Sequence, residues 1–66
     1  MTDNKNSKIS FIEKTGSAMR INQTISALES SSAAHKEIVV PKGDVHIAEK
    51  ILDNKNLNGK IDIKAI

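Results

Sequence analysis

The helix signals of this chain are strongest in residues 43–66, which read GDVHIAEKILDNKNLNGKIDIKAI. Asp44 is suited to be an N-cap, because its carboxylate can accept a hydrogen bond from an amide of the first helical turn. Apolar side chains then recur at spacings of three and four residues, and the stripe consists of Val45, Ala48, Ile51 and Leu52. This pattern predicts a short amphipathic helix.

The residues that follow predict a polar turn and the opening of another helix. Residues 54–59 are rich in asparagine and glycine, which tolerate left-handed backbone conformations and therefore end helices. Asp62 is placed to cap a new turn, and the apolar residues of the chain's end are Ile61, Ile63 and Ile66. We expect these last residues to begin a second helix that offers an apolar surface.

A further helix is predicted within residues 15–29, with Thr15 or Ser17 as its cap. Its apolar seam repeats at three, four and three residues and consists of Ala18, Ile21, Ile25 and Leu28. Two roles are open for this seam. It can pack against the stripe of the helix in residues 43–66, or it can be kept for a partner's helix or groove.

Two segments carry strand signals. Residues 8–14, KISFIEK, fit either a short strand or one helical turn with Ser10 and Glu13 as a capping box. Residues 36–41, KEIVVP, give the clearest strand signal of the chain. Because a lone strand is unstable, this segment pairs with residues 8–12, adds to a partner's sheet or stays extended. We favour the extended form.

Size and composition predict a weak core. The chain has 66 residues, no cysteine and a single aromatic residue, Phe11. A disulfide framework is therefore excluded, and little apolar area is available to offset chain entropy. We expect a small, mostly α, partly disordered fold with two or three short helices and a short extended segment near residues 36–41. The expected segments are a disordered tail at 1–7, a helical segment at 8–29, a linker at 30–35, and an extended segment plus helix-turn-helix start at 36–66.

Charge and hydropathy disfavour several classes of partner. The net charge of +2 arises from ten basic and eight acidic residues that are mixed along the chain. With no basic run, one arginine and one aromatic residue, the chain is poorly equipped to bind nucleic acid. No apolar run is long enough to span a membrane, and the first residues lack the apolar core of a signal peptide. We expect a cytoplasmic protein that does not bind membranes.

Catalytic and metal-binding patterns are not found. His46 and Glu49 are one helical turn apart, a spacing typical of an exposed pair, and His35 follows a serine- and alanine-rich linker. The turn that starts at Asn54 resembles the calcium loops of EF-hands and dockerins, but amides replace the first carboxylate ligands and Ala65 stands where a bidentate glutamate is needed. We expect no enzyme activity, no cofactor, no metal and no small-molecule ligand.

One family resemblance concerns the organisation of residues 38–66. A valine-rich segment, a short helix, a polar turn and an Ile-Asp-Ile-Lys-Ala-Ile segment follow one another, and the residues that carry the likeness are Val40, Ala48, Leu52 and the segment 61–66. In this order the chain resembles the flagellar anti-sigma factors. The resemblance implies a chain that is largely unfolded alone and that wraps a sigma factor with short C-terminal helices.

These observations favour a non-enzymatic regulatory protein that binds another protein by coupled folding, as an inhibitor, anti-sigma factor or antitoxin does. The residues expected to contact the partner are Ala18, Ile21, Ile25, Leu28, Val45, Ala48, Ile51, Leu52, Ile61, Ile63 and Ile66. One alternative is a dimeric DNA-binding regulator of the ribbon-helix-helix type, in which the strand of residues 36–41 pairs across a two-fold axis. Another is a structural subunit of a larger assembly.

Overall fold

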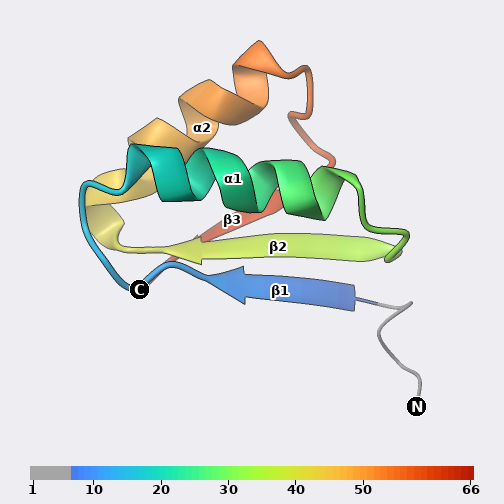
Figure 1. Cartoon of the computed structure of the whole chain (residues 1–66), viewed down its shortest axis with the longest axis horizontal. Helices are drawn as coiled ribbons and strands as arrows, with labels where there is room; N and C mark the ends of the chain where they lie inside the picture. The colour runs from blue at the N-terminus through green and yellow to red at the C-terminus, as the bar shows by residue number, and fades with distance from the viewer. Residues whose placement is uncertain (1–6) are drawn as a thin grey trace.

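A computed structural model describes residues 7–66 of the chain. Strands and helices alternate along it (Figure 1). The elements are β1 (Ser7–Phe11), α1 (Ala18–Glu29), β2 (His35–Val40), the 3-10 turn η2 (Lys42–Asp44), α2 (Val45–Asn54) and β3 (Asp62–Ala65). The chain is therefore a β-α-β-α-β unit.

The three strands form one parallel sheet in the order β1-β2-β3. The register pairs Phe11 of β1 with Val39 of β2, and Val39 with Lys64 of β3. Pairing continues beyond both outer strands, because the N–H of Ile12 donates to the Val39 carbonyl at 2.7 Å and the N–H of Ile66 donates to the Val40 carbonyl at 3.0 Å. β2, which carries the contiguous apolar run Ile38, Val39 and Val40, is thus the central strand.

Both helices lie on the same face of the sheet (Figure 1). Connections between neighbouring parallel strands are right-handed in nearly all proteins. Since the chain steps from β1 to β2 and on to β3 in one direction, two such connections place α1 and α2 on the same side. The opposite face of the sheet receives no helix from the described residues.

The core lies between this helical layer and the sheet. Its buried residues are Ile12, Ile21, Ile25, Leu28, Ile38, Val40, Ala48, Leu52, Leu57 and Ile61. From β2, Ile38 and Val40 enter it with no exposed surface. The seam of α1 and the stripe of α2 meet there, so the apolar periodicity of both helices is used within the chain.

The loops that leave β1 and β2 are tied together at the carboxyl ends of the strands. The N–H of Gly16 donates to both carboxylate oxygens of Asp44, at 3.0 Å each. Asp44 does precede α2, as predicted, but its side chain makes no capping hydrogen bond to that helix. Asp44 is only 1% exposed, and its carboxylate instead accepts the hydrogen bond from the loop that follows β1.

Three expectations about the fold are wrong. The chain is not mostly α, because it contains a three-strand parallel sheet. Residues 36–41 are not a free extended segment, since most of them belong to the central strand. The last residues do not open a helix but form β3, which removes the C-terminal helix that the likeness to anti-sigma factors implied.

The physical reason is the same for all three. Each strand is short, with four to six residues, and gains stability only from neighbours that are distant in the sequence. The two helices were predicted correctly, because helix periodicity is a local signal. Of the expected tail at 1–7, residues 1–6 lie outside the described residues and Ser7 begins β1.

Candidate protein-binding surface

The sheet face that carries no helix is the candidate functional surface. Because side chains alternate between the two faces of a strand, every second residue of β1, β2 and β3 points away from the helices. We call this surface the open face and define it by Ser7, Ile9, Phe11, His35, Glu37, Val39, Asp62, Lys64 and Ile66. None of these residues belongs to the core between helices and sheet.

The open face is apolar along β1, at Val39 of the central strand and at the end that carries Ile66. Phe11, the only aromatic residue of the chain, is 65% exposed, and Ile9 beside it is 47% exposed. Val39 lies between Phe11 and Lys64 on the central strand and is buried. Ile66 extends the apolar area past β3 and is 58% exposed. Parallel sheets are almost always covered on both faces, so apolar side chains in this position indicate a surface made for burial.

The other end of the open face is polar and cross-linked. His35 Nε2 lies 2.9 Å from Asp62 Oδ2, which joins β2 to β3, and 4.0 Å from Glu37 Oε1. Both partners of the shorter contact are well exposed, so it contributes at most a fraction of a kcal/mol. The contact instead fixes a position, because it holds the Asp62 carboxylate at the edge of the apolar area.

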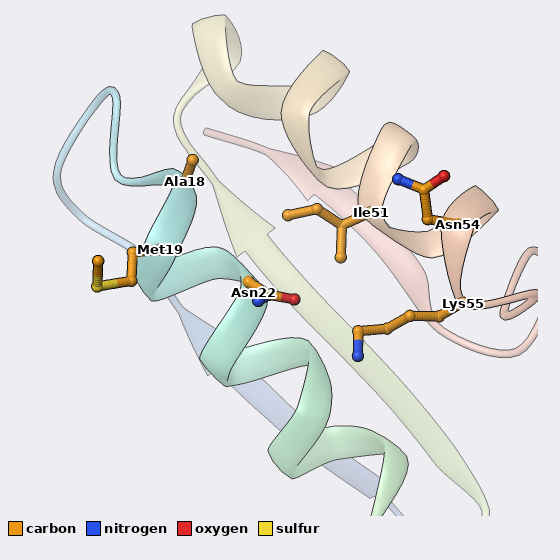
Figure 2. Close-up of a pocket in the computed structure, with 6 residues that line it drawn as sticks. All are labelled: Ala18, Met19, Asn22, Ile51, Asn54 and Lys55. Carbon is orange, nitrogen blue, oxygen red and sulfur yellow. The ribbon is translucent and has the colours of Figure 1, made fainter.

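A second surface feature is a groove between α1 and α2, with a volume of about 520 Å³. Its lining residues are Ala18, Met19, Asn22, Ile51, Asn54 and Lys55. Ile51 of α2 and Lys55, the residue after α2, extend into the space between the helices, whereas Met19 points away from it (Figure 2). The groove is open and half of its lining residues are polar, namely Asn22, Asn54 and Lys55, which makes it a weaker candidate than the open face.

The eleven residues predicted to contact a partner are divided between the core and the surface. Six lie in the core and are buried: Ile21, Ile25, Leu28, Ala48, Leu52 and Ile61. Val45 and Ile63 are half-buried against that core, and Ala18 and Ile51 line the groove between the helices. Only Ile66 lies on the open face.

Sequence reasoning missed the apolar residues that the fold exposes, namely Ile9, Phe11 and Val39. The signal that could have found them is a run of consecutive apolar residues in each of two segments. Phe11 is followed by Ile12, and Val39 is flanked by Ile38 and Val40, so both faces of these strands carry apolar side chains. Once the strands are placed in one parallel sheet, the second apolar set has no helix to cover it.

The described residues were also predicted to lack a metal site, a catalytic site and a membrane span, and their side chains are arranged as follows. Across residues 7–66, no group of three or more His, Cys, Asp or Glu side chains is arranged to hold a metal ion. His46 and Glu49 are exposed on the outer side of α2, where they line a shallow depression with Lys50, Asp53 and Asn58. Neither α1 nor α2 has the length and apolar character that crossing a bilayer demands.

Comparison with known proteins gives no relative. No protein-family model matches the chain, and neither the curated proteins nor the solved structures include one with significant similarity to it.

Proposed function

We propose that this chain is a non-enzymatic protein-binding module and that the open face is its docking surface. The observation that carries the proposal is a parallel sheet whose two helices cover the same face and leave Ile9 and Phe11 exposed on the other. Burial of an exposed large apolar side chain contributes about 1.5–3 kcal/mol to association, so these side chains supply a real driving force.

The distribution of polarity on the open face supports docking onto a protein. Its apolar area, formed by Ile9, Phe11 and Val39, is bordered by Glu37 on β2 and by Asp62 and Lys64 on β3. The His35–Asp62 pair closes one end of the face. An apolar area with a charged border is the usual anatomy of a specific protein interface. A lipid surface would instead favour an unbroken apolar face with a basic border.

The buried core favours a preformed docking surface over folding on the partner. Ten residues already form one buried cluster between the sheet and the two helices. The strands that present the open face are fixed to each other by backbone pairing, so little chain entropy is lost when the face is covered. A regulator that masks a surface of another protein is a role that suits such a module.

The sheet topology argues against a ribbon-helix-helix dimer. In that arrangement the strand before a helix pairs with its copy across a two-fold axis. Here β2 precedes α2 but has β1 on one side and β3 on the other, so both of its edges are in use.

A position-specific crosslinking experiment tests the proposal. A photoreactive benzoylphenylalanine replaces Phe11 in one variant and Glu49, on the outer side of α2, in a matched control. In the native cell extract, position 11 is expected to give protein adducts and position 49 is not. The substitution Ile9→Lys, beside the probe, should suppress the adducts at position 11. Equal yields at both positions, or adducts unaffected by Ile9→Lys, would contradict the proposal.

A further inference from the structure

We infer that the open face binds a second copy of this chain, in a symmetric dimer whose two-fold axis runs across the strands between the two sheets. The inference rests on the proposed function, because it names the partner of the same surface. It follows from the order of charged and apolar residues on the open face.

Two neighbouring rows of side chains cross the open face. The first row is Ile9, Glu37 and Asp62, and the second row is Phe11, Val39 and Lys64. Each row takes one residue from each strand, because the register pairs these positions directly. The rows lie about 6.7 Å apart along the strands, since they are separated by two residues.

A two-fold axis that runs across the strands, midway between the rows, brings unlike rows together. Each strand then lies over its own copy in the opposite direction, and the first row of one protomer faces the second row of the other. Asp62 faces Lys64 of the other copy, and this pair occurs twice. On the β1 side, Ile9 faces Phe11 of the other copy, and this apolar contact also occurs twice.

The central strand fits the same arrangement. Glu37 faces Val39 of the other copy, beside the Lys64 side chain on the next strand, which lies about 4.8 Å away. A glutamate side chain can turn toward that lysine, which compensates its charge. Sheets stacked face to face keep their strands aligned within about 30°, which preserves these neighbours over so small a patch.

A two-fold axis that runs parallel to the strands also stacks these faces, and it gives poorer contacts. It places Glu37 against its own copy and Ile9 against Asp62, because each row then faces itself in reverse order. Like charges directly opposite each other disfavour that dimer. Of these two arrangements, the charges of the open face favour the one whose axis runs across the strands.

The size of the face predicts weak association. Three strands spaced about 4.8 Å apart and roughly 17 Å long give a projected area of about 250 Å² on each copy. An interface of this extent falls in the class of small, transient interfaces, below about 1,200 Å² of total buried area. We therefore expect a dissociation constant in the micromolar range or above.

Sedimentation equilibrium of the full chain, from 10 µM to 1 mM, tests the inference. The average mass should rise with concentration from 7.2 kDa toward twice that value. Asp62→Lys and Lys64→Asp each place like charges at both symmetric contacts, and each should raise the dissociation constant at least about tenfold. Asp53→Lys and Lys50→Asp make the same charge changes on the exposed side of α2 and should leave it unchanged.

Mixing the two variants gives the decisive comparison. An equimolar mixture of Asp62→Lys and Lys64→Asp restores opposite charges at both contacts, so it should dimerise although neither variant does so alone. A misfolded variant could not recover in this way. A chain that stays at 7.2 kDa at 1 mM, or a mixture that does not recover, would overturn the inference. If position 11 still crosslinks to a different protein, the docking surface stands and only the second copy is excluded.

Discussion

The backbone N–H of Gly16 donates to both carboxylate oxygens of Asp44, at 3.0 Å each, across 28 positions of the chain. This contact joins the loop after β1 to the start of α2. It fixes how the two β-α connections lie at the carboxyl ends of the strands, and so it holds both helices over one face of the sheet.

Loss of the Asp44 carboxylate should destabilise the fold. Asp44→Ala removes a hydrogen bond to a charged acceptor and leaves the Gly16 N–H without its partner, so the free energy of unfolding should fall by about 1.5–3 kcal/mol. Asp53→Ala, on the exposed side of α2, is the matched control and should change it by less than about 0.5 kcal/mol. Urea denaturation followed by circular dichroism measures both. Equal effects of the two substitutions would show that the Gly16–Asp44 contact carries no stability.

Two glycines in neighbouring loops should respond to alanine with opposite signs. Gly16 has φ +79°, a left-handed conformation that costs other residues about 1–2 kcal/mol, so Gly16→Ala should lower the melting temperature. At Gly43 an added Cβ would meet only the Thr15 Cγ2 at 3.9 Å, an ordinary contact. Gly43→Ala should therefore be neutral or stabilise by up to about 1 kcal/mol. If calorimetric scans showed a larger decrease in melting temperature for Gly43→Ala than for Gly16→Ala, the loop geometry would be contradicted.

Substitutions at two adjacent residues, Phe11 and Ile12, should have different effects, one on association and the other on stability. Ile12 lies in the core and is 2% exposed, so Ile12→Thr, which buries a hydroxyl and removes apolar contacts, should cost about 2–4 kcal/mol. Phe11 lies on the open face, so Phe11→Thr should change stability by no more than about 0.5 kcal/mol while it weakens dimerisation. Denaturation and sedimentation of both variants test this difference. If Phe11→Thr destabilised the fold and left association unchanged, Phe11 would belong to the core, and the assignment of the two faces would be wrong.

The seam of α1 should behave as core. Ile25 has no exposed surface, so Ile25→Ala should lower the free energy of unfolding by about 2–5 kcal/mol. Met19, on the same helix, is 75% exposed, and Met19→Ala should be close to neutral. Chemical denaturation checks the pair. If Ile25→Ala were as stable as the unsubstituted chain and lost only partner binding, the seam of α1 would be an interface and not part of the core.

Local patterns in the sequence were sufficient for the helices and the turn between α2 and β3. The apolar spacing around Ile21 and Ile25 predicted α1, and the asparagine- and glycine-rich turn does adopt left-handed conformations, at Asn56 and Gly59. These features depend on interactions within a few residues, which a single sequence displays directly.

The sheet and the candidate surface depend on contacts that the sequence does not display. Ile38 and Val40 read as a strand, but their neighbours, near Ser10 and Ile63, lie 25 or more positions away along the chain. The open face could be recognised only after the strand order was known. Alternate residues of a strand point to opposite faces, so an isoleucine or valine lies in the core or on the surface according to whether its position is odd or even. The buried role of Asp44 was hidden for the same reason, since its donor comes from another loop.

The most direct measurement of the central claim is the concentration dependence of side-chain NMR signals in the full chain. Between 10 µM and 1 mM, the methyl signals of Ile9 and Val39 and the ring signals of Phe11 should shift along one binding curve. The methyl signals of Met19 and Ile51, at the groove between the helices, should stay in place. Shifts confined to Met19 and Ile51, or no shift at any of these residues, would contradict burial of the open face against a second copy.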